Sequence, residues 1–172
     1  MLIAGTTISL AGTGQHQASG QHRSGTSLSN AGLRNVGPGW VLTQYTTAPP
    51  GGGGPSGPMW LYLISPSGTR YQLARWPNNQ TGPQLIDWSP DGSRALFEVF
   101  SAHPYLEQMT LATRAVRTFS LPADWTPVGY TLPSGQDIVA STVAGNEQAL
   151  ASFDLTGRLV RKLGPSGDGR VL

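Results

Sequence analysis

The chain has 172 residues, of which 38% are hydrophobic and only 12% are charged, together with 23 Gly and 14 Pro. This length is typical of one domain. Long helices need many Ala, Leu, Glu and Lys residues, and the chain has a single lysine, Lys162. The absence of cysteine excludes disulfides and thiolate metal sites. The sequence has no run of eighteen apolar residues, the length that a membrane-spanning helix needs.

The basic isoelectric point, near 9.3, does not indicate nucleic-acid binding. The formal net charge is only +2, and phosphate recognition requires several cations that converge on one face. The nearest approach to such a cluster is at the C-terminal end, where charged residues also protect a strand edge from pairing with another chain. Those residues are Arg158, Arg161, Lys162 and Arg170. We therefore expect no nucleic-acid partner.

Residues 1–37 are expected to form a flexible N-terminal segment, because most of them are polar or small and follow neither a helical nor a strand period. Residues 1–12 are mildly apolar, so they are either the remnant of a signal peptide or leader without its basic start, or an ordinary run of small residues. His16 and His22 lie in this segment without supporting ligands, which makes them weak metal candidates.

From residue 38 to residue 172 short β-prone segments alternate with turns, a pattern typical of an antiparallel meander. Gly and Pro separate the segments, and the Pro- and Gly-rich run 49–58 predicts a long loop, since no helix or lysine follows that would make it a phosphate loop. The expected strands are 40–46, 60–64, 69–73, 85–88, 94–100, 106–111, 116–121, 128–131, 137–142, 150–153 and 159–163.

Two parts of this meander repeat each other. Pro90 and Pro133 are separated by the same number of residues as Gly92 and Gly135. A period of about 40 to 45 residues with four strands per unit is the period of a β-propeller blade. In the first repeat the turn is Trp88-Ser89-Pro90-Asp91-Gly92, in which Pro presets φ, Asp can bond the backbone and Gly accepts a positive φ. Pro133 and Gly135 belong to a degenerate copy of this turn, and we interpret all seven residues as structural.

The stretch from Leu85 to Phe97, which contains this turn, resembles the TolB-like or PD40 family of WD40-type propellers. The resemblance covers about residues 39–165 and implies a fold of about three blades. The sequence therefore predicts an all-β protein: a partial β-propeller of antiparallel four-stranded blades in an incomplete ring. The resemblance also implies a protein partner in the cell envelope, and hence an exported protein of the periplasm or envelope, the alternative being a cytoplasmic one.

No set of residues in the sequence combines a nucleophile, a base and an oxyanion donor. A Gly-x-Ser-x-Gly elbow is absent, most carboxylates are in turns, and His103 precedes Pro104 in a loop without an acidic neighbour. We therefore predict no catalytic residue, no cofactor and no metal, and a binding or scaffold module in preference to an enzyme. The alternative is an accessory propeller of a larger, prolyl-oligopeptidase-like hydrolase whose catalytic domain is outside this chain.

An incomplete ring leaves blade faces without a neighbour, so we also expect either self-association through open blade edges or marginal stability with aggregation. The apolar residues expected to be exposed there are Trp40, Leu42, Tyr62, Ile64, Phe153, Leu155 and Val160. The alternative is a compact sheet stack that folds its ends onto each other.

Overall fold

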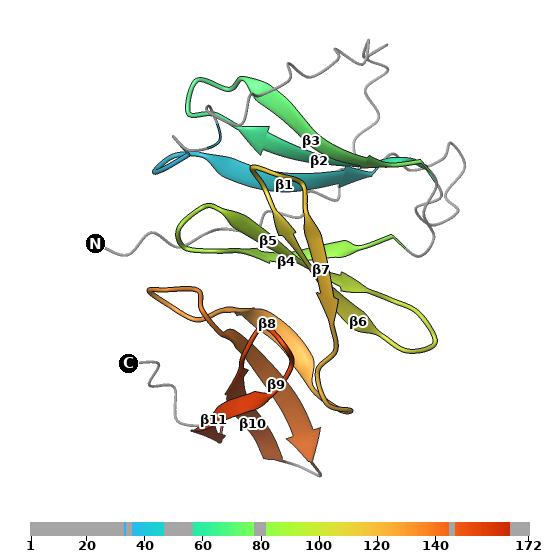
Figure 1. Cartoon of the computed structure of the whole chain (residues 1–172), viewed down its shortest axis with the longest axis vertical. Helices are drawn as coiled ribbons and strands as arrows, with labels where there is room; N and C mark the ends of the chain where they lie inside the picture. The colour runs from blue at the N-terminus through green and yellow to red at the C-terminus, as the bar shows by residue number, and fades with distance from the viewer. Residues whose placement is uncertain (1–32, 34–35, 47–56, 78–81, 145–146, 166–172) are drawn as a thin grey trace. The chain divides into compact units, whose positions relative to one another are not determined.

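The computed structural model describes residues 33, 36–46, 57–77, 82–144 and 147–165 (Figure 1). Within these ranges every regular element is a β-strand, so the predicted all-β class is confirmed. The chain divides into two compact units, Met1–Gln80 and Thr81–Leu172. The expectation of a flexible segment over residues 1–37 falls almost entirely outside the described residues.

The first unit contains one three-stranded antiparallel sheet in chain order. Its strands are β1 (Val41–Thr46), β2 (Met59–Ile64) and β3 (Arg70–Trp76). The central strand β2 is buried at its first five positions, as expected for an apolar strand paired on both edges. Aromatic rings brace the sheet: Trp40 stacks on Tyr71 with centroids 5.8 Å apart, and Tyr45 contacts Trp60 at 6.0 Å.

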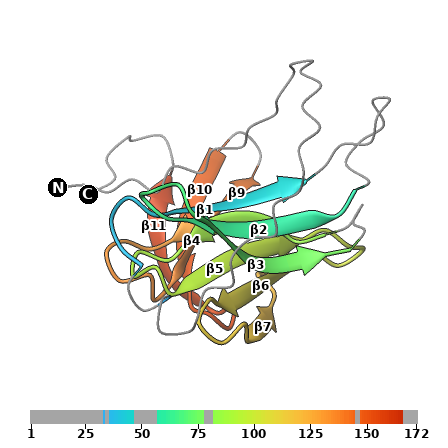
Figure 2. The same cartoon turned by 90° about the horizontal axis from the view of Figure 1, so that it is seen from above.

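The second unit contains two four-stranded antiparallel sheets, each a simple meander with its strands side by side in chain order (Figures 1 and 2). The first sheet consists of β4 (Gln84–Trp88), β5 (Arg94–Val99), β6 (Tyr105–Thr110) and β7 (Val116–Phe119). The second consists of β8 (Thr126–Tyr130), β9 (Ile138–Ala144), β10 (Glu147–Phe153) and β11 (Leu159–Pro165).

The first strands of these two sheets, β4 and β8, contact each other. Successive four-stranded meanders that meet through their first strands are the arrangement of neighbouring β-propeller blades. The fold class of the second unit is therefore that of a partial propeller, in agreement with the prediction from the repeat.

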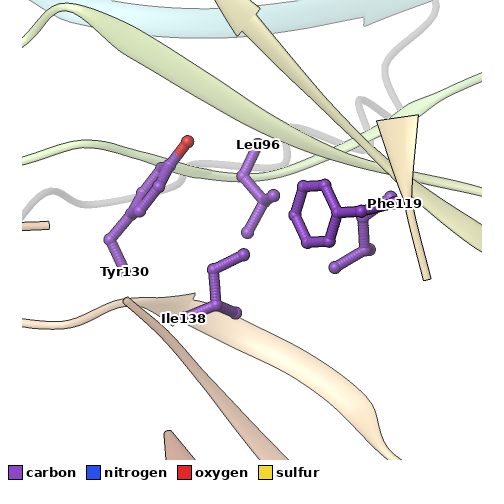
Figure 3. Close-up of a cluster of buried hydrophobic side chains, with 5 residues drawn as sticks. Leu96, Phe119, Tyr130 and Ile138 are labelled. Atoms are coloured by element: carbon purple, nitrogen blue, oxygen red, sulfur yellow. The ribbon is translucent and has the colours of Figure 1, made fainter. Parts of the chain in front are cut away.

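A shared hydrophobic core holds the two sheets together. Leu96 and Phe119 of the first sheet point toward Tyr130 and Ile138 of the second, and Leu106 completes this buried cluster (Figure 3). A smaller cluster follows in the second sheet, where Phe153 is 1% exposed and packs near Ala140, Ala151 and Trp125. Side chains from both sheets thus exclude water from one continuous interface, which is the main source of their association.

Strand β5 is covered on both of its faces. Ala95, Leu96 and Phe97 are each 0% exposed although they alternate between the two faces of the sheet. The exception is Phe100, just after the strand, which is 48% exposed.

The expected exposure of particular apolar residues was wrong at several positions. Leu42, Tyr62 and Phe153 are buried, Phe153 because it packs near Ala140, Ala151 and Trp125, whereas Val160 on the edge strand β11 is 51% exposed. On β9, Val143 is 67% exposed, since it lies beyond the core residues Ile138 and Ala140 toward the end of the strand. Exposed apolar area is therefore present on the second sheet of this unit, but at positions other than most of those predicted.

Tyr130 carries a buried phenol group in the shared core. Gln108 Nε2 donates a hydrogen bond to its hydroxyl at 3.0 Å, and burial raises the pKa of Tyr130 to about 12. Above pH 10 the unfolded chain releases this proton while the folded chain keeps it, so stability falls as the pH rises from 10 toward 12.

We expect the loss that is due to Tyr130 to approach about 1.4 kcal/mol per pH unit in that window. Urea unfolding at a series of pH values from about 9 to about 11.5 measures it, and Tyr130→Phe provides the comparison, since that variant lacks the titrating group. Equal slopes for the variant and the parent would contradict the assignment.

Candidate functional site

The five motif residues from Trp88 to Gly92 form the tight turn between β4 and β5. Gly92 has a φ of 69° and its N–H donates to the Ser89 carbonyl at 2.8 Å, as the turn chemistry predicts. Ser89 Oγ donates to Asp91 Oδ1 at 2.6 Å and accepts from the Arg94 N–H at 2.9 Å. The turn therefore bonds to itself and to the start of β5.

The carboxylate of Asp91 accepts hydrogen bonds from within the turn. Burial alone would raise its pKa, but hydrogen bonds from Ser89 and from the Ser93 N–H and hydroxyl, together with Arg94, hold the pKa below its usual value. The Arg94 guanidinium lies 3.6 Å from the carboxylate. With these contacts Asp91 stabilises the turn, which supports the structural interpretation of the motif.

The second copy of the turn, which contains Pro133 and Gly135, is built differently. Leu132 replaces the serine, the Leu132–Pro133 peptide is cis, and the Gly135 N–H donates to the Thr131 carbonyl at 2.7 Å. Thr131 Oγ1 accepts a bond from the Asp137 N–H at 3.2 Å. A threonine hydroxyl one position earlier thus replaces the missing serine.

The structure brings the two turns into contact. A Cβ atom on Gly135 would lie 2.7 Å from Pro90 Cδ and 3.5 Å from Ser89 Cβ, so glycine is needed for the close approach. Trp88 directly precedes Ser89, and its indole Nε1 is buried without a hydrogen-bond partner within the described ranges. We therefore propose that all seven motif residues act in the packing between repeats.

A second bond across the repeats lies next to the turns. Asp87 Oδ2 accepts a hydrogen bond from the Tyr130 N–H at 2.7 Å, and Asp87 Oδ1 accepts one from the Trp88 N–H, also at 2.7 Å. Gly129 makes room for this carboxylate, because a Cβ there would come within 2.6 Å of Asp87 Oδ2. Asp87 therefore joins β4 directly to β8. From the sequence alone it could be interpreted only as one of several structural turn carboxylates.

A pocket of about 150 Å³ lies at the other end of β5, between the loop that leads into β6 and the connection from β7 to β8. It is lined by three prolines, two aromatic side chains, two leucines, an alanine and two carboxylates, and we call it the loop pocket. The residues that matter below are Glu98, Pro104, Tyr105, Pro122, Asp124 and Trp125.

Two features give the loop pocket its shape. Trp125 packs edge-to-face on Phe153 with ring centroids 5.0 Å apart, which fixes the indole. The backbone N–H of Trp125 donates to the Pro122 carbonyl at 3.3 Å, and between them Asp124 adopts a φ of 70°, an unusual value for a residue other than glycine. The pocket wall is thus set by a defined turn and by the half-buried Trp125 ring, which packs on the buried Phe153.

The sequence did not predict this pocket, although one signal was present. Glu98 is the only charged residue within the apolar run 95–100 that follows Arg94. The structure places it in the wall of the loop pocket. Tyr105 and Trp125 are far enough from Glu98 in sequence that only the fold shows that they converge.

A wider, more open hollow of about 470 Å³ adjoins the loop pocket through the shared residue Tyr105. His103 lines it and is exposed, and the His103 N–H donates to Ser101 Oγ at 3.2 Å. Among the described residues no carboxylate lines this hollow, so the side chains there provide no acid–base pair.

In the part of the chain that the structure describes, no three His, Asp or Glu side chains are positioned to hold a metal ion. The same residues include no helix long and apolar enough to cross a membrane. What the geometry of the second unit defines is a pair of packed, blade-like meanders with a small aromatic pocket at a loop end.

Comparison with known proteins finds a similar solved structure. No protein-family model matches the chain, and no curated protein does. Among solved structures, the crystal structure of TolB from Acinetobacter baumannii is similar over 60% of this chain and 26% of the TolB chain, with 27% sequence identity and a TM-score of 0.42. The match spans about a quarter of the length of the TolB chain.

Proposed function

We propose that this chain is a non-catalytic, propeller-type binding or scaffold module that holds another protein at the loop end of its sheets. The observation that carries the proposal is the loop pocket, because it is lined by aromatic side chains, prolines and two carboxylates, with no serine or histidine among its described lining residues. Aromatic side chains that are fixed by packing are typical anchoring surfaces for protein partners.

The two ends of the sheets have different roles in this proposal. At the motif turns, Ser89, Asp91 and Thr131 form hydrogen bonds within the turns, and glycines allow close packing between repeats. At the loop end, Phe100 is 48% exposed and is followed closely in the chain by the pocket residues Pro104 and Tyr105. An exposed aromatic side chain close in sequence to the pocket residues is available for contact with a protein partner.

The envelope location belongs to the same proposal and rests on the resemblance of the turn to TolB-like propellers. Fractionation of the source cells tests it separately from binding: the protein should be released with periplasmic or envelope material. Recovery with the cytoplasmic fraction would contradict the location and leave the binding proposal in place.

Site-specific photo-crosslinking in the source cells tests the binding proposal. A photoreactive residue in place of Phe100 should give one dominant protein adduct, because this position is exposed at the loop end. The same residue in place of Val116, which is 48% exposed at the start of β7, is the matched control and should not give that adduct. Equal adducts at both positions, or none at Phe100, would contradict binding at the loop end.

A further inference from the structure

The loop pocket has a consistent local charge. The two charged side chains that line it are both carboxylates, Glu98 and Asp124, although the whole chain carries a net charge of +2. Asp124 lies at the exposed rim, whereas Glu98 is half-buried near the end of β5. An incoming group therefore meets negative charge both at the entrance and in the wall.

The carboxylate of Glu98 lacks stabilising contacts among the described residues. Burial raises its pKa, which means that its charged form is disfavoured where it stands. Among the described residues its side chain has no hydrogen bond or ion pair, unlike Asp91 or Asp154. A half-buried anion without a partner gains more from an incoming cation than an exposed one does.

The aromatic residues point to the same ligand chemistry. Tyr105 and Trp125 line the pocket beside the two carboxylates. Aromatic faces attract cations, most strongly when the cation is partly desolvated, and a guanidinium can also stack on the ring. The prolines of the wall, Pro104, Pro122 and Pro127, make the site rigid before a ligand arrives.

We infer that the loop pocket binds a basic side chain, an arginine or a lysine, presented by an exposed segment of the partner protein. This inference rests on the proposed binding function and names the chemistry of the partner. The volume of about 150 Å³ accommodates a single side chain and not a folded element, so the contact is one anchor within a larger interface. A phosphate, a carboxylate or an acidic segment is disfavoured by the charge of the wall.

Blocked five-residue peptides test the inference on the full chain. The probes are Gly- and Ser-based peptides with a central arginine, lysine, norleucine or glutamate, and the readout is the Trp125 indole signal in nuclear magnetic resonance, assigned with Trp125→Phe. The arginine peptide should shift this signal with a dissociation constant on the order of millimolar, as expected for one anchor. The glutamate peptide should produce no shift.

Glu98→Gln should weaken arginine-peptide binding about tenfold, the effect of removing one charged hydrogen-bonding partner. The matched control is Glu107→Gln. Glu107 is also half-buried with a pKa raised by burial, but it lies on the adjacent strand β6 outside the pocket lining, so its substitution should leave binding unchanged. Tyr105→Leu should weaken binding as well, and it keeps the inference testable if Glu98→Gln does not fold.

The outcomes separate this inference from the proposed function. Equal binding of the norleucine and arginine peptides, or equal effects of Glu98→Gln and Glu107→Gln, would overturn the basic-anchor inference and leave the photo-crosslinking result to decide on partner binding. Absence of any shift with the arginine or lysine peptide at concentrations well above millimolar would also overturn the inference.

Discussion

Gly157→Ala is expected to destabilise the second unit by about 3 to 5 kcal/mol, the combined cost of a left-handed backbone and a steric overlap. Gly157 has a φ of 82° in the turn between β10 and β11. A Cβ there would overlap the backbone carbonyl oxygen of Ser120, which belongs to the segment that leaves β7. Because backbone atoms cannot rotate away as a flexible side chain does, the turn and the β7 end would have to separate. Thermal and urea unfolding measure the loss.

The matched control is Gly164→Ala in the same unit. Gly164 has a φ of 101°, but no neighbouring atom lies within 4 Å of the position that a Cβ would take, so this change carries the backbone cost alone, about 1 to 2 kcal/mol. Gly157→Asn adds a second comparison, since asparagine tolerates a positive φ but still carries a Cβ. Equal losses for Gly157→Ala and Gly164→Ala would show that the contact with Ser120 is not formed.

Asp87→Ala is expected to cost about 3 kcal/mol, because it removes a charged acceptor of two backbone N–H groups, each worth about 1.5 to 3 kcal/mol with partial compensation by water. Tyr130 would lose the acceptor that ties its N–H to β4. Asp87→Asn keeps one acceptor oxygen and should lose less. Urea unfolding of the three proteins tests this order, and a loss in Asp87→Ala no larger than about 0.5 kcal/mol, the scale of an ordinary surface substitution, would contradict the link between the sheets.

Gly129 provides an independent check on this link. Gly129→Ala alone should be destabilising, since its Cβ would press on the Asp87 carboxylate at 2.6 Å. In the Asp87→Ala background that atom is gone, so the same substitution should cost clearly less. A double-mutant cycle measures the difference, and strictly additive effects would mean that the two residues do not interact.

The strands could be predicted from local pattern, because most of the apolar or β-branched runs are bounded by Gly, Pro or Asp. All eleven expected segments overlap observed strands, with shifts of a few residues at their ends such as 69–73 against Arg70–Trp76. The spacing of Pro90 from Pro133 also predicted the repeat correctly, since a tight turn depends on a few residues at fixed positions. These features depend on neighbours in sequence, which is why they could be read without a structure.

The candidate site could not be predicted, because it depends on contacts between distant segments. Glu98, Tyr105 and Trp125 meet only after β7 crosses to β8, and neither composition nor period encodes that crossing. The same reason explains the misplaced exposed residues. Phe153 follows an ordinary alternation of apolar and polar residues, but whether its face is covered depends on Trp125 and Ala140 from other segments.

The hydrogen bond between Asp87 and the Tyr130 N–H joins residues one repeat period apart, so the two sheets have different roles in it. The acceptor lies on the earlier repeat and the donor with its glycine on the later one. At the position one period after Asp87 the second repeat carries Tyr130 itself, which has no carboxylate to offer onward. The second sheet can therefore donate this hydrogen bond to the sheet before it but has no equivalent carboxylate to accept one from a sheet after it. Any subunit or repeat packed beyond β8–β11 would have to be held by different contacts.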